Sequence, residues 1–332
     1  MANMARLGIR LDPIPQINPR EALELSILAE KLGYQTLWVP EGGGRDSLTQ
    51  LAAFAGVTKT IQLGTGILPV FSRTPTVMAM SAVSLDMISD HRFILGLGVG
   101  HKGVVEKLHG MSFEKPFSRI RETVEIVRRL MGGGQVSYEG KTFNLQNGSL
   151  GFPQEFHIPI YIAALGPQMM ELAGELADGV LLNWAAPSYL KEALYHLGLG
   201  AARAGRDPKE IDVACYIRVA VTPDEEGVRA SLRRQILRYA SLEYYKKFFI
   251  KAGFGEEIQA IDHYLSEGDR TNAAASIGPQ MERALAVFGS ADFCRKEIEE
   301  RRRLGVKMPV IAPFAVGGAV NSYRAAIEAF SG

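Results

Sequence analysis

The sequence predicts a (β/α)8 barrel of the TIM type, formed as a single domain from residues 1–332. Three observations lead to this fold class. Eight short apolar runs alternate with segments that have helical spacing, most of these runs end in glycine, proline or a polar residue, and 332 residues suffice for such a barrel with insertions. A doubly wound open sheet alternates in the same way and is the chief rival fold.

The eight apolar runs have the length and composition of buried parallel strands. The third run carries Gly64 and Gly66 at the point where the strand should end. Glycine weakens a strand interior, so this pair suggests a bulge or a close approach of the backbone to a bound group, with an ordinary turn as the alternative. The expected strands are residues 7–11, 35–39, 61–70, 92–97, 159–164, 179–183, 211–222 and 308–312.

The segments between the runs carry recognisable helix starts and stops. Asn18-Pro19 joins an N-cap residue to a proline at the first helical position, and another helix starts at Thr74-Pro75. Gly33 is a natural C-terminal stop. The expected helices begin at or near residues 19, 46, 75, 116, 167, 187, 224, 290 and 319.

Two segments fall outside this alternation and are predicted to be insertions that cover the ligand pocket. Residues 132–157 begin with three glycines and predict a hairpin followed by a loop. Residues 240–288 predict additional helices that are broken by glycines.

Composition narrows the classes of function. Lys and Arg number 37 against 36 Asp and Glu, without a long basic run, so a nucleic acid is not expected as a partner. Cys215 and Cys294 stand far apart in the sequence, which supports neither a disulfide framework nor a thiolate metal site. No apolar run reaches membrane-spanning length and the first residues lack a signal-peptide pattern, so we expect no membrane association and a cytoplasmic location.

The sequence lacks the usual motifs of metal-dependent or nucleophilic catalysis. Its six histidines have no metal-ligand spacing, and there is no H-E-x-x-H, G-x-S-x-G or P-loop motif. We therefore expect no metal ion, and a bound organic cofactor that carries the chemistry.

A barrel of this kind forms its active site at the carboxyl ends of the strands. Glu41, which follows the second strand, is either a site carboxylate or a solvated loop residue, and its position favours the site. The residues that the predicted fold collects at this end are Asp12, Glu41, Gly66, Ile67, Gly98, Val99, Gly100, His101, Ala164, Leu165, Gly166, Asn183, Trp184, Pro313 and Phe314.

Two further strand ends suit a cofactor. Residues 98–103 satisfy G-x-G-x-x-G, but they follow the fourth strand, which disfavours a nicotinamide-binding Rossmann fold. A glycine-lined loop whose amides face an anionic or planar ligand fits better. Residues 163–167 join a strand to a helix start, where free amides suit a phosphate; a plain turn is the alternative.

Several segments together resemble the bacterial luciferase-like superfamily. The resemblance lies in Trp38-Val39-Pro40-Glu41, Leu63-Gly64-Thr65-Gly66-Ile67 and Leu95-Gly96-Leu97-Gly98-Val99-Gly100. Residues 159–183, PIYIAALGPQMMELAGELADGVLLN, are similar to its deazaflavin-dependent branch, typified by methylenetetrahydromethanopterin reductase. The resemblance covers most of the chain and implies the same barrel fold.

The resemblance also implies coenzyme F420, a deazaflavin, as the cofactor, with FMN as the alternative. In that branch the third strand ends in a bulge with a non-prolyl cis peptide bond behind the ring system, which falls here at Gly66–Ile67. Relatives are often dimers or tetramers, so a homo-oligomer is expected. The implied cofactor-binding residues are Glu41, Thr65, Gly66, Ile67, Gly98, Val99, Gly100, Ala163, Ala164, Leu165, Gly166 and Asn183, of which Ala164, Leu165 and Gly166 would hold the phosphate.

Two departures from the family pattern put the archetype's own substrate in doubt. The family often has Asp-His after the second strand, but this chain has Glu41-Gly42 and so lacks a histidine acid or base there. Arg10 stands in the first strand, where the archetypal reductase has a glutamate.

We therefore expect an F420-dependent oxidoreductase that transfers a hydride between the cofactor and an organic small-molecule substrate. The candidate catalytic residues are Glu41, His101 and Arg10, and Arg10, Trp38 and Trp184 are candidates for the substrate pocket. An FMN-dependent luciferase-like monooxygenase and a non-catalytic F420-binding barrel are the alternatives.

Overall fold

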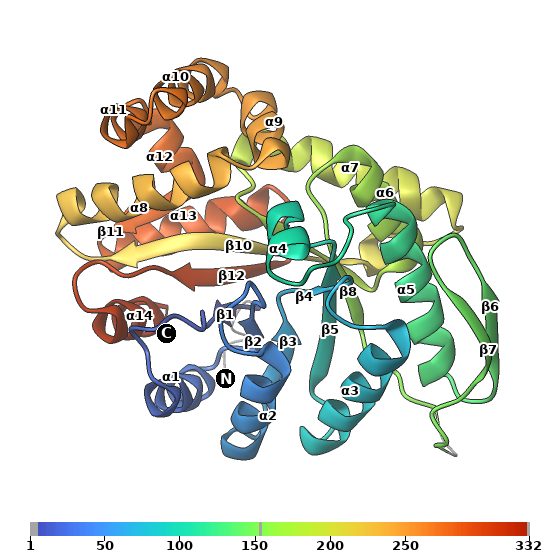
Figure 1. Ribbon diagram of the computed structural model, residues 1–332. Coiled ribbons are helices and arrows are strands. Elements are labelled where there is room, and N and C mark those ends of the chain that lie inside the picture. The colour runs from blue at the N-terminus through green and yellow to red at the C-terminus, as the bar shows by residue number, and fades with distance from the viewer. Residues whose placement is uncertain (1–5, 153–154, 331–332) are drawn as a thin grey trace.

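The computed structural model describes residues 6–152 and 155–330, and its centre is a closed barrel of parallel strands (Figure 1). Each barrel strand pairs with the next, and the pairings of β1 with β12 and of β9 with β10 close the ring. All eight expected strands are present, and the open-sheet rival is wrong. The barrel strands, in the order of the ring, are β1 (Gly8–Arg10), β2 (Thr36–Val39), β3 (Gln62–Thr65), β5 (Phe93–Gly98), β8 (Ile160–Ala163), β9 (Gly179–Asn183), β10 (Asp212–Val221) and β12 (Met308–Pro313).

Helices follow the barrel strands and pack on the outside of the barrel (Figure 1). The first of them begins at the expected Asn18 cap, whose side chain accepts from the amides of Arg20 and Glu21 at 2.9 and 3.0 Å. The Glu21 carboxylate accepts in return from the Asn18 amide, which completes a capping box. These helices are α1 (Pro19–Lys31), α2 (Ser47–Val57), α3 (Pro75–Ile88), α5 (Pro116–Met131), α6 (Pro167–Leu176), α7 (Pro187–Arg203), α8 (Glu225–Ala240), α13 (Ala291–Arg303) and α14 (Ala319–Glu328).

The structure corrects the expected elements in three places. The run 61–70 is divided at Gly66–Ile67 into β3 and a short β4 (Leu68–Pro69). A short helix, α4 (Lys102–Lys107), follows the glycine-marked end of β5. The expected helical insertion 240–288 ends in a strand, β11 (Ala286–Gly289), because β10 is ten residues long and extends past β9. The first half of β10 pairs with β9 and its last residues pair with β11.

The two insertions lie on different parts of the barrel (Figure 1). The hairpin of β6 (Val136–Glu139) and β7 (Asn144–Gly148) packs along α5, where Glu122 accepts from three hairpin amides, so it does not cover the mouth as expected. Residues 153–154 of that insertion lie outside the described part of the chain. The second insertion comprises α9 (Glu243–Lys251), α10 (Gly255–Ser266), α11 (Arg270–Ala275) and α12 (Pro279–Leu285); a 3-10 turn, η1 (Pro208–Glu210), precedes β10.

A buried carboxylate fixes the second insertion to the barrel wall. Glu282 of α12 has no exposed surface and accepts from Arg229 and Arg233 of α8. Two cations around one carboxylate compensate its burial, so this group joins α12 to α8 and holds the insertion beside the barrel mouth.

The barrel interior is filled by side chains, as in other barrels of this type. Trp38 is fully buried there, donates from Nε1 to Thr36 Oγ1 at 2.8 Å and lies 5.3 Å from the Tyr161 ring. A Cβ on Gly64 would come within 2.5 Å of the Trp38 ring, so the indole occupies the space that this glycine leaves. The interior cluster consists of Trp38, Ile94, Tyr161, Leu181, Ala214, Tyr216, Met308, Val310 and Ala312. None of the described helices is long and apolar enough to cross a membrane.

Candidate active site at the mouth of the barrel

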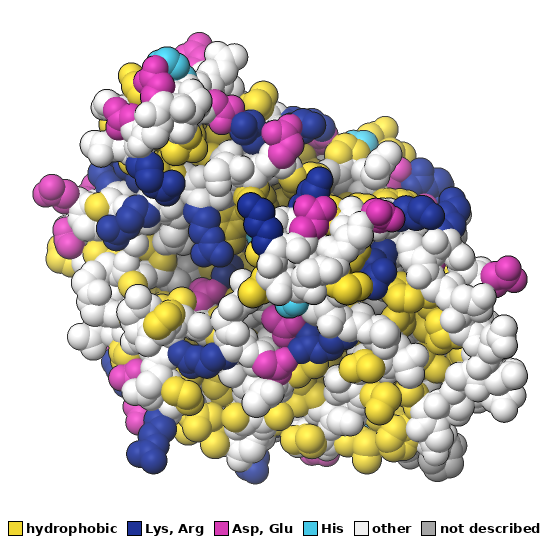
Figure 2. Space-filling view, viewed as in Figure 1, with side chains coloured by type: hydrophobic (Ala, Val, Ile, Leu, Met, Phe, Trp, Pro, Cys, Tyr) yellow, Lys and Arg dark blue, Asp and Glu magenta, His cyan; other side chains and the backbone are white. Residues whose placement is uncertain are grey.

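The carboxyl ends of the strands form one mouth, which α8 and α9 border on one side (Figure 1). The space-filling view shows a hollow in this face, with Lys and Arg side chains gathered along the α8 side of it (Figure 2). The topology brings together the predicted residues Arg10, Thr65, Gly66, Ile67, Gly98, Val99, Gly100, His101, Ala163, Ala164, Leu165, Gly166, Asn183 and Trp184 at these strand ends.

The β3 end is shaped by close contacts within the protein. The Gly66–Ile67 peptide bond is cis. The Tyr216 hydroxyl donates to the Gly66 carbonyl at 2.9 Å, and a Cβ on Gly66 would overlap that hydroxyl. The Thr65 hydroxyl donates to the Gly96 carbonyl and accepts from the Gly96 amide, both at 2.8 Å. The sequence suggested a bulge or a close approach to a bound group at this strand end, and in the structure the group that lies against Gly66 is the Tyr216 side chain.

A low apolar wall continues from this corner across the ends of β5 and β8. A Cβ on Gly98 would lie 2.8 Å from the Ile67 side chain and 3.3 Å from Ala163, so the absence of a side chain at Gly98 lets Ile67 lie flat against the strand ends. Ile67 and Ala163 are both partly exposed. The wall is made of small or aliphatic groups and suits a planar ring.

Glu41 is held in an ion-pair network. Its carboxylate accepts from both terminal nitrogens of Arg73 and from the Ser47 hydroxyl at 2.9 Å. Arg73 also pairs with Asp46. The Glu41 side chain is 11% exposed and its charge is compensated, so it joins the end of β2 to the starts of α2 and α3. This arrangement suits a structural carboxylate better than an acid or base.

Arg10 lies deep in the mouth. Its Nε donates to an Asp12 oxygen at 2.9 Å, and its guanidinium lies over the Tyr216 ring at 4.8 Å. The other Asp12 oxygen accepts from the Tyr323 hydroxyl at 3.1 Å. The Arg10 side chain is 12% exposed, so its charge is largely removed from water and balanced by one carboxylate.

A second buried guanidinium belongs to Arg218 of β10, a residue that is not among the candidates predicted from the sequence. It is 4% exposed, donates to the Asn183 side-chain oxygen at 2.8 Å and lies over the Trp184 ring at 4.1 Å. The Asn183 amide donates in turn to the Tyr245 hydroxyl at 2.8 Å. Among residues 6–152 and 155–330, no carboxylate forms an ion pair with Arg218, and its hydrogen-bond partner is the Asn183 amide. The mouth therefore carries an excess of positive charge.

Trp184 has a left-handed backbone conformation, with φ of 57°. This places its indole under Arg218 and 5.2 Å from the Tyr239 ring. Its Nε1 is buried and, within the described part of the chain, has no hydrogen-bond partner. Trp184 thus lies at the mouth, and its part in a substrate pocket stays a prediction, whereas Trp38 lies in the closed interior below the mouth.

Two titratable groups border the positive centre. Burial lowers the pKa of His101, and the charge of Arg238 lowers it further, which favours the neutral imidazole. Burial acts to raise the pKa of Tyr239, but the guanidinium groups of Arg218 and Arg10 outweigh it and lower that pKa below the ordinary value. Tyr239 and Tyr245 come from the predicted helical region, which carries no motif that could have identified them.

The start of α6 is the place where the sequence predicts an anion site. Gly166 is its N-cap residue and has no side chain to satisfy the first amides of the helix. A Cβ on Gly166 would lie 2.6 Å from the hydroxyl of Tyr244, a residue of α9 that is 53% exposed. A hydroxyl group therefore lies close to the start of α6, where a phosphate would meet the helix amides.

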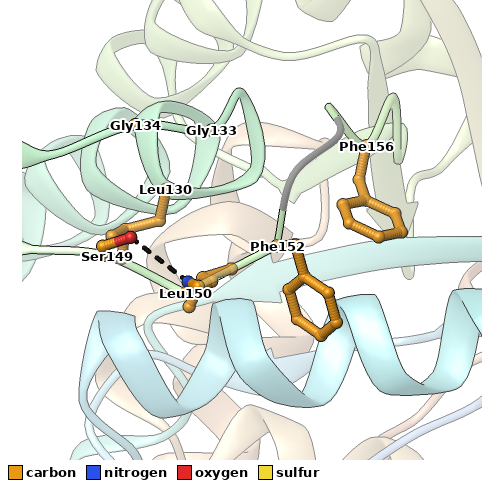
Figure 3. Close-up of a pocket in the computed structure, with 8 residues that line it drawn as sticks. Leu130, Gly133, Gly134, Ser149, Leu150, Phe152 and Phe156 are labelled. Carbon is orange, nitrogen blue, oxygen red and sulfur yellow. Dashed lines mark hydrogen bonds between the residues drawn. The ribbon is translucent and has the colours of Figure 1, made fainter.

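A pocket elsewhere in the molecule does not offer comparable chemistry. It lies beside the carboxyl end of α5, and Phe152 and Phe156 are prominent in its wall (Figure 3). The polar side chain of its lining is Ser149, whose hydroxyl accepts from the Gly151 amide. The pocket is lined by Leu130, Gly133, Gly134, Ser149, Leu150, Gly151, Phe152 and Phe156.

Comparison with known proteins agrees with this picture. The family model of the luciferase-like monooxygenases matches residues 4–308. The chain is 31% identical over 296 residues to 5,10-methylenetetrahydromethanopterin reductase of Archaeoglobus fulgidus, covering 87% of this chain and 88% of that protein. The corresponding reductase of Methanolobus tindarius is 32% identical over 304 residues, with 87% and 89% covered.

A solved structure extends the similarity to the fold. The coenzyme F420 dependent tetrahydromethanopterin reductase from Methanopyrus kandleri superimposes with a TM-score of 0.80. The two chains are 26% identical, and the match covers 98% of each.

Proposed function

The chain belongs to the luciferase-like monooxygenase family, and on that premise we propose that it is an F420-dependent oxidoreductase, which transfers a hydride between the deazaflavin and an organic small molecule. The observation that carries this proposal is the full-length similarity to a reductase whose name states its dependence on coenzyme F420. The family assignment, the barrel and the mouth described above are consistent with it.

The residues at the mouth fit a deazaflavin. The low apolar wall of Ile67, Gly98 and Ala163 leaves the side-chain-free surface that a planar ring needs. The α6 start, with Leu165 and Gly166, would hold the cofactor phosphate through free amides. Of the other expected cofactor residues, Thr65 braces the bulge through Gly96, and Asn183 orients Arg218.

The chemistry is divided between cofactor and protein. The cofactor, when bound, supplies or accepts the hydride. The protein positions the substrate against the ring, excludes water and provides charge at the mouth through Arg10 and Arg218. The Glu41 carboxylate is paired with Arg73, and the lowered pKa of His101 favours its neutral form. Both residues are therefore weaker catalytic candidates than the sequence suggested.

The test is a fluorescence titration of the purified protein with F420 and, separately, with FMN. We expect saturable binding of F420 that is weakened when a bulky side chain replaces Gly98, because Gly98→Val would raise the apolar wall. Gly103→Val is the matched control, since a Cβ there meets nothing within 4 Å. Tight binding of FMN alone, with oxygen consumption by the reduced protein, would favour a monooxygenase instead. Binding of F420 without hydride transfer to any tested substrate would favour a non-catalytic barrel.

A further inference from the structure

We propose that Tyr239 is a catalytic acid–base residue of this site, and that the substrate presents to it the oxygen of a carbonyl group or of the corresponding alcohol. The inference rests on the proposed hydride transfer and adds to it the residue that handles the proton. Hydride transfer to a carbonyl carbon leaves a negative charge on oxygen, so a proton donor must lie at that oxygen.

The geometry gives Tyr239 a fixed ring and an available hydroxyl. Its ring lies 4.7 Å from that of Tyr245, 5.2 Å from Trp184 and 5.9 Å from His101. The hydroxyls of Tyr216, Tyr245 and Tyr323 are engaged with Gly66, Asn183 and Asp12 respectively. The Tyr239 hydroxyl, by contrast, has no hydrogen-bond partner among the described residues, and its residue is partly exposed at the mouth.

The charges around Tyr239 favour its phenolate. Arg218 of β10, Arg10 of β1 and Arg238 of its own helix all act on it with positive charge. Asp12, which follows β1, is the one carboxylate among these influences, and it is already bound to Arg10. Tyr216, Tyr245 and His101 are the remaining titratable groups around it, and burial keeps the first two protonated by raising their pKa.

Arg218 also suits the substrate oxygen directly. Its guanidinium is held in place by Asn183 and by the Trp184 ring, and its hydrogen bond to Asn183 uses one of its five N–H groups. Arg218 acts on Tyr239 with its positive charge, and no carboxylate among the described residues pairs with its remaining donors. An oxygen between Arg218 and Tyr239 would therefore receive both a proton donor and a stabilising charge.

The proposed step balances. In the reducing direction, the reduced cofactor, when bound, would supply a hydride to form a C–H bond at the carbonyl carbon, and the C=O π pair would move to oxygen. That pair takes the proton of the Tyr239 hydroxyl to form the alcohol O–H. The carbonyl compound is reduced, the cofactor is oxidised, and the phenolate of Tyr239, stabilised by Arg218 and Arg10, regains a proton from water.

The first experiment titrates the tyrosines of the protein without cofactor, using the ultraviolet absorbance of phenolate. We expect one tyrosine to ionise below the ordinary pKa of about 10. Tyr239→Phe should remove this transition, whereas Tyr195→Phe, at a 63% exposed position on α7, should leave it. Persistence of the low transition in Tyr239→Phe would overturn the inference.

The second experiment measures F420 binding and the F420-dependent reduction of aldehydes and ketones. Tyr239→Phe should bind F420 as the wild type does and lose about 10²–10⁴-fold in kcat. In the wild type, reduction should slow as the pH rises through the pKa of Tyr239, because the step consumes the protonated phenol, and the variant should lack this dependence. Failure of the wild type to bind F420 would contradict the proposed function itself. If Tyr239→Phe binds F420 normally and keeps the kcat and pH profile of the wild type, only the role of Tyr239 would be contradicted.

Discussion

Gly66 is the residue at which the smallest change should have a large effect. Its Cα faces the Tyr216 hydroxyl so closely that an added methyl group would overlap it. Gly66→Ala should therefore lower the free energy of unfolding by about 1–3 kcal/mol, the usual cost of overpacking. Urea denaturation measures this loss. Gly42→Ala is the control, because a Cβ there meets nothing within 4 Å.

A second substitution tests whether the overlap with Tyr216 is the cause. Tyr216→Phe removes the hydroxyl oxygen, so the double variant Gly66→Ala, Tyr216→Phe should recover part of the stability lost by Gly66→Ala. Equal unfolding midpoints for Gly66→Ala and the wild type would show that the strand end can move away, contrary to the contact described here.

Arg238 offers a test of the electrostatics at the mouth with an exposed residue. Its charge lowers the pKa of both His101 and Tyr239. Arg238→Gln should raise both values, since removing a cation favours the imidazolium and disfavours the phenolate. The change should be small, as expected for a charge that water screens. Titration followed by NMR measures both groups, and movement of the two values in opposite directions would contradict this account.

Among the elements, the loops that follow β2 and β4 depend on each other through one ion pair. Glu41 and Arg73 have side chains 11% and 18% exposed, and Asp46 at the start of α2 shares the arginine. Arg73→Ala should lower the free energy of unfolding by about 1–3 kcal/mol, less than for a fully buried pair because water reaches this one. Thermal unfolding checks the loss.

The matched control for this pair is an exposed one. Lys102 and Glu106 lie 3.9 Å apart with side chains 69% and 42% exposed, so Lys102→Ala should change stability by no more than a few tenths of a kcal/mol.

Glu41→Gln distinguishes the structural role of the Glu41 carboxylate from a catalytic one. A structural role predicts lost stability with an unaltered pH profile of activity, and a lost acidic limb in that profile would restore Glu41 as a catalytic candidate.

At the scale of the whole molecule, the barrel was predictable because its pattern is local. Each strand is an apolar run between a cap and a turn, and alternation with helices leaves few possible folds. The centre of the mouth was not predictable in this way. Arg218 and Tyr216 lie within an apolar run, and polar residues inside such a run are the signal that could have singled them out. Tyr239 meets them from α8, through a tertiary contact that no local pattern records.

Trp38 is a second residue whose position in the barrel could not be predicted from the sequence. Its place in the second strand made it a candidate for the pocket. Strand residues alternate between the barrel interior and the outer helices, and among the interior residues only those near the carboxyl end of a strand reach the mouth. Trp38 pairs in register with Arg10 of β1, yet its indole packs on Tyr161 and Gly64 in the interior. Sequence order alone does not give that depth.

The outer surface of the barrel carries a candidate interface for the predicted homo-oligomer. Hydrophobic side chains gather in the region of α2 and α3 (Figure 2). On α3 the exposed apolar residues are Val77, Met80, Met87 and Ile88, which are 44%, 53%, 52% and 59% exposed. Exposed apolar side chains clustered on one helix are typical of interfaces, so we predict that the expected homo-oligomer forms through α3.

Met80→Glu should therefore weaken self-association, because a symmetric contact would bring the new carboxylate and its copy into one desolvated interface. A cost of about 3 kcal/mol raises the dissociation constant about 10²-fold, which sedimentation velocity over a range of concentrations can resolve. Leu304→Glu is the control, since Leu304 is a 42% exposed apolar residue that follows α13, away from α3. A monomeric wild type, or an equal effect of the two substitutions, would remove α3 as the interface. Dissociation by Met80→Glu with unchanged F420 binding would show in addition that each barrel forms its site from its own chain.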